Sequence, residues 1–200
     1  TFDQDPALHP WLLQTLLEVA WQHHPRAVLV GANYRDVHRG RDAGRCRAPG
    51  QVEMKRATLI TSGTLLPLRF TTAIGGFRED YFTDSVDHEF CLRASANHCD
   101  VVMTCAQLME HRIGSPGTGG SFFRHLSSNH PAMRKYFIAR NAVATMRSYM
   151  LRAPAWSVRQ GFRLLAEFGS IVLHEQQKRQ KTAAFVRGLG HGLAGRTGPD

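Results

Sequence analysis

Short apolar runs of the kind that form buried strands alternate along this chain with segments of helical periodicity. An amphipathic segment at 10–23 precedes the run AVLVGANY at 27–34, and a helical pattern that begins near Ser85 precedes an apolar run at 100–111. Apolar strands separated by helices pack as a sheet that those helices cover. The sequence therefore predicts an α/β fold in residues 1–153.

Turn residues and helix-ending residues divide the rest of this region. Asn97 stands where the helix that begins near Ser85 needs a left-handed residue to end it. Glycine and proline clusters mark loops, and apolar periodicity marks the elements between them. The further predicted elements are a loop at 36–51, a strand at 52–60, a short helix between Pro67 and Gly75, a glycine-rich loop at 113–123 and a long helix at 131–152.

The composition changes after residue 153. Two basic amphipathic segments, 155–178 and about 181–194, end the chain, and we predict a tail at 154–200 that is distinct from the domain at 1–153. Such a tail either lies on an anionic membrane surface or packs on the domain as a helical hairpin with a solvated basic face. Amphipathicity alone does not separate these two arrangements.

The formal net charge is +9, from 25 lysines and arginines against 16 acidic residues. This excess favours anionic partners such as nucleotides, other phosphates or an acidic membrane surface. No stretch approaches the roughly 20 apolar residues of a membrane-spanning helix. The cysteines lack metal-finger spacing, and we expect free thiols and a cytoplasmic protein. They are Cys46, Cys91, Cys99 and Cys105.

Two acidic residues, Asp3 and Asp5, are separated by one residue, Gln4. On an extended chain the side chains of residues i and i+2 point to the same face, so these carboxylates converge. Paired carboxylates suit Mg²⁺ or Mn²⁺, with phosphate oxygens completing the coordination shell. The alternative is that Asp5 caps the helix that follows Pro6.

Further candidate residues occur where predicted elements begin or end. Asp87 and Glu89 lead a helix, where the helix dipole favours acids and where a carboxylate can also accept a proton from a hydroxyl. His111 ends a strand, as a metal ligand or as an ordinary packing residue. Arg134 and Arg140 lie on a helix behind a glycine-rich loop, where they either bind a diphosphate or form an ordinary basic face.

The order of these motifs resembles that of one enzyme family. The chain contains FDQDP (2–6), TSGTLLPLRFTTAIGGFRED (61–80), YFTDSVDHEFCLR (81–93), LMEHRIG (108–114) and RKYFIARN (134–141). In this order they resemble the family 2 inverting glycosyltransferases of GT-A fold. The similarity is greatest to the bacterial dTDP-rhamnosyltransferases of polysaccharide and O-antigen synthesis.

The resemblance implies a fold, a reaction and a location. The fold would be the C-terminal part of a GT-A fold, which is Rossmann-like, followed by a helical extension. The nucleotide-binding half would precede residue 1, so this chain alone would bind a dTDP-sugar weakly or not at all. The reaction would move L-rhamnose from dTDP-rhamnose, or another sugar from a dTDP- or UDP-sugar, to a hydroxyl of a glycan or lipid-linked acceptor. The enzyme would act in the cytoplasm or at the inner face of the plasma membrane.

The resemblance also implies roles for individual residues. Asp87 would be the catalytic base, and Asp3, Asp5 and His111 would hold a divalent metal, Mg²⁺ or Mn²⁺. Val86 stands where many relatives have an acid. The rhamnosyltransferase subgroup also tends to have an apolar residue at this position. The remaining expected contacts are Arg134, Tyr136 and Arg140 to the diphosphate, and Thr61, Ser62, Gly63, Gly75, Gly76, Phe77 and Glu89 to the sugar and acceptor.

Two other classes of protein compete with this interpretation. A non-catalytic basic module that binds membrane or nucleic acid would explain the charge but not the ordered acids, and the chain has no zinc-finger or RNA-binding signature. We therefore expect no nucleic-acid partner. A metal-dependent phosphohydrolase would need more clustered histidine and aspartate ligands than this sequence offers.

Overall fold

The computed structural model describes residues 1, 7–37, 40–111 and 130–198. The chain forms two compact units. The sheet unit comprises Thr1–Gly76 and Phe90–Ile113, and the helical unit comprises Phe77–Glu89 and Gly114–Asp200.

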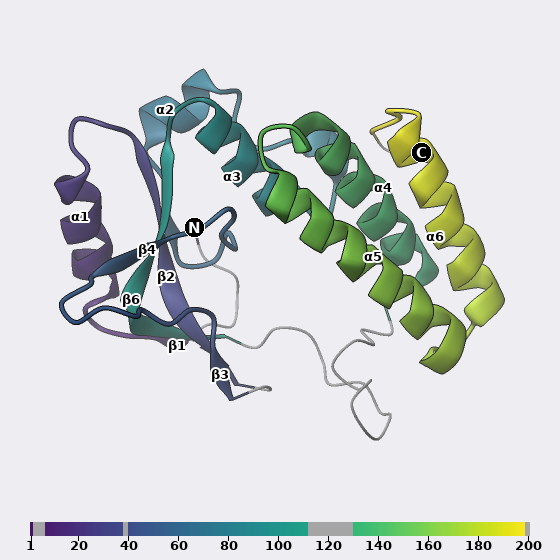
Figure 1. Cartoon of the computed structure of the whole chain (residues 1–200), viewed down its shortest axis with the longest axis horizontal. Coiled ribbons are helices and arrows are strands. Elements are labelled where there is room, and N and C mark those ends of the chain that lie inside the picture. The colour runs from purple at the N-terminus through teal and green to yellow at the C-terminus, as the bar shows by residue number, and fades with distance from the viewer. Residues whose placement is uncertain (2–6, 38–39, 112–129, 199–200) are drawn as a thin grey trace. The chain divides into compact units, whose positions relative to one another are not determined.

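The sheet unit is built on two parallel neighbouring strands, β2 (Val28–Asp36) and β6 (Asp100–His111) (Figure 1). Parallel neighbours require a long crossover connection, and here the chain between them includes helices. The short strands all pair antiparallel with these two. They are β1 (Ala7–Leu8) and β4 (Glu53–Lys55) on β6, and β3 (Arg41–Asp42) and β5 (Thr64–Leu65) on β2. This mixed sheet with helices confirms the predicted α/β class.

Helix α1 (Leu12–Gln22) supplies the apolar layer on one side of β2 and β6. Its buried side chains recur at helical spacing, and the β2 residues in the cluster with it, Val28, Val30 and Ala32, alternate along the strand. The predicted helix at 10–23 and the predicted strands at 27–34 and 100–111 are therefore confirmed. The buried cluster consists of Leu12, Leu16, Val19, Val28, Val30, Ala32, Val102, Leu108 and Met109.

Three short helical elements lie between β5 and β6. They are α2 (Leu68–Ala73), η1 (Glu79–Tyr81) and α3 (Val86–Ala96). The residue with positive φ after α3 is His98, with φ of 63°, so the prediction that Asn97 takes this role is wrong. Asn97 instead donates from its side-chain Nδ2 to the carbonyl of Arg93 at 2.8 Å, which satisfies one of the free carbonyls at the helix end.

The strand predicted at 52–60 is shorter in the structure. Pairing with β6 covers Glu53–Lys55, and the amide of Arg56 donates to the carbonyl of Val101 at 2.9 Å. Leu59 then turns inward and is 3 % exposed, and its amide contacts the Sγ of Cys91 at 3.3 Å. Leu59 is therefore buried beside the sheet and not within it.

The helical unit contains three long helices, α4 (Ala132–Tyr149), α5 (Pro154–His174) and α6 (Lys178–Leu193) (Figure 1). α4 and α6 pack closely because Gly188 and Gly192 face carbonyls of α4, where any side chain would overlap the backbone. α4 thus packs with the two helices of the predicted tail, and the domain boundary after residue 153 stays a prediction. No helix among the described residues is both long and apolar enough to cross a membrane.

A buried ionic cluster lies between these helices. The carboxylate of Glu175 binds the Nζ of Lys135 at 2.5 Å and the Nζ of Lys181 at 2.9 Å, and Lys135 also binds Glu167. Lys181 lies in the segment predicted to be a basic amphipathic face, yet it is 3 % exposed. Burial alone would raise the pKa of Glu175, but the hydrogen bonds from the two lysines outweigh burial and lower this pKa.

Replacing Glu175 with Gln should destabilise the protein by about 3–5 kcal/mol, because the buried ammonium groups of Lys181 and Lys135 both lose a hydrogen-bonded carboxylate, although Lys135 keeps Glu167. Urea unfolding at neutral pH measures this loss. Glu167→Gln is the graded comparison and should cost less, because the Glu167 side chain is 18 % exposed and Lys135 keeps Glu175. Equal costs for the two variants would contradict the dominant role of Glu175.

The pH dependence of this effect has a definite sign. A carboxyl whose folded pKa is lowered contributes stability above its unfolded pKa of about 4.3 and loses it as the pH falls through the folded value. The difference between the wild type and Glu175→Gln should therefore shrink below about pH 4.

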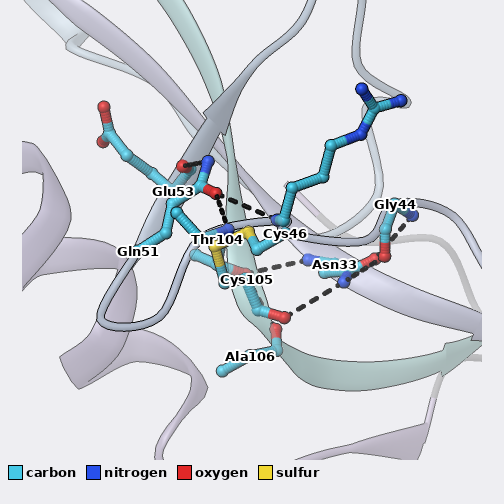
Figure 2. Close-up of a disulfide and its surroundings, with 10 residues drawn as sticks. Asn33, Gly44, Cys46, Gln51, Glu53, Thr104, Cys105 and Ala106 are labelled. Atoms are coloured by element: carbon cyan, nitrogen blue, oxygen red, sulfur yellow. Dashed lines mark hydrogen bonds between the residues drawn. A yellow bond between two sulfur atoms is a disulfide. The ribbon is translucent and has the colours of Figure 1, made fainter.

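The structure contains a disulfide between Cys46 and Cys105 (Figure 2). The expectation of free thiols is wrong for these two cysteines and confirmed for Cys91 and Cys99, which are free and buried. Burial raises the pKa of the Cys99 thiol to about 11, so it stays protonated at neutral pH. Because disulfides persist in oxidising compartments, the pair removes the cysteine argument for a cytoplasmic location, which stays a prediction.

Candidate functional site

The Thr-Ser-Gly segment of the sheet unit forms a turn beside the first residue of the chain. The side-chain hydroxyl of Thr1 donates to the carbonyl of Thr61 at 2.5 Å, and the amide of Gly63 donates to the carbonyl of Thr1 at 2.9 Å. Gly63 has a φ of +71°, and a Cβ there would lie only 3.1 Å from the Met109 side chain. The positive φ therefore favours glycine, and a side chain here would also crowd Met109. Ser62 is 2 % exposed.

The predicted metal residues Asp3 and Asp5 lie outside the described residues. The residues on either side of their segment are placed: Thr1 lies against the Thr-Ser-Gly turn, and Ala7 pairs with Glu110 of β6. Glu110 is followed by His111, the third predicted ligand. Thr1 therefore lies beside the predicted residues Thr61 and Gly63, and Ala7 pairs with the residue that precedes His111.

His111 occupies the end of β6 opposite Asp36, the last residue of the parallel strand β2. Directly opposed residues of neighbouring strands project to the same face of a sheet. The imidazole also lies edge-on to Tyr34, with 5.9 Å between ring centroids. A carboxylate beside an imidazole suits Mn²⁺ better than Mg²⁺, because imidazole is a ligand for transition metals. Among the described residues no three potential ligands converge.

Asp36 was not among the predicted site residues, although the sequence carries a signal for it. It is the acidic residue that follows the apolar strand, and it is 5 % exposed. In α/β sheets, ligands bind beyond the carboxyl ends of parallel strands, and Asp36 and His111 share such an end. A search for acids at strand ends would therefore have found it.

The Gly75-Gly76 pair forms a turn held by an arginine of the sheet unit. Both glycines have positive φ, +87° and +64°. Arg93 donates from its guanidinium to the carbonyl of Ile74 at 2.5 Å and to the carbonyl of Gly76 at 2.6 Å. The two glycines are thus explained by the left-handed turn that Arg93 holds. Contact of this turn with a sugar stays a prediction. Phe77, the next residue, is half-buried.

The two acids of the second motif have different surroundings. Asp87 lies in the first turn of α3 with 26 % of its side chain exposed, and its Oδ1 accepts the amide hydrogen of His88 at 2.8 Å. Glu89 is 2 % exposed and accepts a hydrogen bond from the hydroxyl of Tyr149 at 2.9 Å. Of these two acids, Asp87 is therefore the one that can receive a proton from a bound molecule.

The loop that leads into Asp87 has a strained backbone. Phe82, Asp84 and Ser85 all have positive φ, which residues other than glycine rarely adopt. Asn141 is fully buried and donates to three carbonyls of this loop, including those of Thr83 at 2.6 Å and Asp84 at 3.0 Å. The predicted diphosphate motif RKYFIARN thus contains, in Asn141, the residue that holds this loop in place.

Asp80 is a weaker candidate for the base than Asp87. A hydrogen bond from the guanidinium of Arg78 lowers the pKa of Asp80 to about 2. A carboxylate with so low a pKa is a poor proton acceptor at neutral pH, because catalytic bases work best with a pKa near the operating pH.

The predicted diphosphate residues also differ in access. The guanidinium of Arg134 binds both carboxylate oxygens of Asp84, at 3.0 and 3.2 Å, and its side chain is 45 % exposed. Tyr136 is 3 % exposed, and its hydroxyl lies 2.8 Å from the Nδ1 of His191. Arg140 is 1 % exposed and donates to the carbonyls of Asp80, at 2.9 Å, and Gly198. A diphosphate contact at Arg140 would require these bonds to break.

Comparison of the chain with protein-family models, with curated proteins and with solved structures found no match. The expected site residues are divided between the two units. The sheet unit holds Thr61, Ser62, Gly63, Gly75, Gly76 and His111, and the helical unit holds Phe77, Asp87, Glu89, Arg134, Tyr136 and Arg140.

Substitution of the two arginines separates structural from binding roles. Arg140→Gln should lower the free energy of unfolding by about 2–5 kcal/mol, because buried carbonyls lose a charged donor. Arg134→Gln removes a surface ion pair and should cost less than about 1 kcal/mol. Chemical unfolding of both variants checks this, and a stability loss at Arg134 as large as that at Arg140 would contradict it.

Proposed function

We propose that this chain is part of an inverting glycosyltransferase of GT-A fold. It transfers a sugar, L-rhamnose from dTDP-rhamnose, to a hydroxyl of a glycan or lipid-linked acceptor in cell-surface polysaccharide synthesis. The order of the sequence motifs supports the family. The observation that carries the proposal is the presentation of Asp87, a partly exposed carboxylate at a helix start, by a strained loop that Asn141 holds.

In this proposal Asp87 is the general base. The acceptor hydroxyl oxygen attacks the anomeric carbon of the donor sugar from the face opposite the nucleoside diphosphate. A new carbon–oxygen bond forms, the bond to the diphosphate oxygen breaks, and the hydroxyl proton passes to the Asp87 carboxylate. One displacement inverts the anomeric centre.

Negative charge grows on the leaving diphosphate during this displacement, and cations that face it lower the barrier. Arg134 is the predicted diphosphate residue that is exposed, so it is the one we assign to this role. A divalent metal held by Asp3, Asp5 and His111 would supply further positive charge there. Asp36, opposite His111, adds a carboxylate to the same end of the sheet.

Asp87→Asn tests the proposed base. Asparagine keeps an oxygen that can accept the amide hydrogen of His88 but cannot take up a proton at neutral pH. Transfer from dTDP-rhamnose with Mn²⁺ or Mg²⁺ should fall by about 10²–10⁴-fold while the melting temperature changes little.

The matched control for this experiment is Glu79→Gln, which neutralises an exposed acid of the same unit. Its transfer rate should equal that of the wild type. The assay uses the full natural protein that contains this chain, with dTDP- and UDP-sugars compared as donors. Full activity of Asp87→Asn would refute the assignment.

We further propose that α5 is the membrane contact of the tail. One stripe of this helix, with Trp156 and Ile171, is buried. At about 100° per residue, Val158, Phe162 and Leu165 lie on the opposite side, and they are 60–68 % exposed. A helix with a second apolar face flanked by arginines binds anionic lipid surfaces.

Flotation with phosphatidylglycerol vesicles tests this contact. Replacing Phe162 and Leu165 together with Glu should abolish flotation, since two charges would enter the apolar stripe. Replacing Leu13 and Leu17, which are exposed on α1, with Glu adds the same charge in the sheet unit and should leave flotation intact. Equal flotation of both variants would exclude α5 as the contact.

A further inference from the structure

A cavity of about 840 Å³ lies in the sheet unit, over the loop from Arg41 to Arg47. Met54 and Arg56, at and after strand β4, complete its lining. Pockets that hold small molecules commonly measure about 300–1,000 Å³, so the volume is that of a ligand larger than a single phosphate.

The lining is strongly basic. It contains Arg41, Arg45, Arg47 and Arg56 against one acid, Asp42, so its formal charge is +4 − 1 = +3. In the described part of the chain, no carboxylate lies within ion-pair distance of Arg41, Arg45 or Arg47. Arginine forks bind phosphate oxygens in pairs, and these three guanidinium groups have no ion pair with a described residue.

The loop that carries these arginines is fixed on both sides of Arg45 (Figure 2). The side chain of Asn33, which is 2 % exposed, donates to the carbonyl of Gly44 at 3.0 Å and accepts the amide hydrogen of Gly44 at 3.1 Å. Cys46 is bonded to Cys105 of β6. A Cβ at Gly44 would come within 2.5 Å of the Met54 sulfur, so a larger residue here would require the Met54 side chain to move.

The backbone beyond the disulfide is also held. The side-chain oxygen of Gln51 accepts the amide hydrogens of Arg47, at 3.1 Å, and Ala48, at 3.3 Å (Figure 2). Gln51 itself is anchored by donating to the carbonyl of Glu53 in β4 at 2.7 Å. Arg45 and Arg47 thus project from a backbone that need not be ordered when a ligand binds, which reduces the entropic cost of binding.

We propose that this cavity, the arginine pocket, binds a compact anion that carries two or more phosphate groups. The ordinary alternative is a solvated basic loop on a protein of net charge +9. A solvated loop would attract anions without needing a cross-linked backbone, a buried asparagine and a glycine in close contact. The pocket shares no residue with the proposed transferase site, so either proposal can fail without the other.

Calorimetric titration of the chain with inorganic diphosphate, at physiological salt, tests the pocket. We expect binding by the wild type and at least tenfold weaker binding by the double variant Arg45→Gln with Arg47→Gln. The control double variant Arg26→Gln with Arg69→Gln removes the same charge from exposed positions of the same unit and should bind within twofold of the wild type. No binding by the wild type, or equal loss in both double variants, would overturn the proposal.

A second variant tests the fixed backbone. Replacing Cys46 and Cys105 with Ser keeps every arginine but frees one side of the loop, and should weaken diphosphate binding several-fold. Circular dichroism at the titration temperature confirms that the variant is folded. Unchanged affinity for diphosphate in this folded variant would overturn the inference that the fixed loop backbone shapes the binding site.

Binding to vesicles that contain phosphatidic acid shows whether the phosphate groups of the ligand belong to a lipid headgroup or to a soluble molecule. If the ligand is a lipid headgroup, diphosphate will compete with vesicles for the wild type, and the arginine double variant will lose vesicle binding. If the ligand is soluble, vesicle binding will be the same in that variant and in the wild type, and diphosphate binding alone will be lost.

Discussion

The parallel pairing of β2 with β6 is the constraint on which the sheet unit depends. Each other strand of the described sheet pairs with one of these two, and the α1 core packs on both. The pairing also positions two candidate site residues, because it sets Asp36 opposite His111 at the carboxyl ends of the strands. Parallel strands far apart in the sequence gain this geometry only after a long crossover closes, so local sequence does not determine it.

The register between these strands is interrupted at two places, between Gly31 and Asn33 and between Asn33 and Tyr34, and the first has consequences for the arginine pocket. Gly31 is opposite Met103 and Asn33 is opposite Gln107, so β6 has two extra residues over this interval. Within the interval the hydroxyl of Thr104 accepts the amide hydrogen of Asn33 and donates to the carbonyl of Ala106, both at 3.0 Å. Cys105 therefore lies in an irregular segment beside Asn33, where it meets Cys46.

Much of the fold could be predicted because periodicity is a local property. The helix at 10–23 and the strands that form β2 and β6 follow from apolar spacing alone. The disulfide could not be predicted in the same way, since its cysteines are 59 residues apart and only the fold brings their Cα atoms to 5.6 Å. Leu59 shows the same limit, because an apolar residue beside a sheet has the same sequence pattern as one within it.

The candidate site was predictable in part. Asp87 was identified correctly as a residue at a helix start, but the sequence could not show that Glu89 is buried against Tyr149. The sequence could have shown that Arg134 and Arg140 lie on different sides of their helix. Six residues along a helix place two side chains about 120° apart, so both arginines could not face one ligand from one stripe. The role of Asn141 required the positions of the carbonyls that it binds.

The interrupted register also bears on how the chain tolerates changes of length. Deleting two residues from the Thr104–Ala106 stretch would remove the register shift between Gly31 and Asn33, and the shift between Asn33 and Tyr34 would remain. The apolar alternation on either side would be preserved, because an even change keeps each side chain on its own face of the sheet. The anchor that Cys105 gives to the loop at 41–47 would be affected, and so would the pairing of Thr104 with Glu53 of β4. The irregular segment of β6 therefore connects the arginine pocket to the sheet, and a change of length there would alter both.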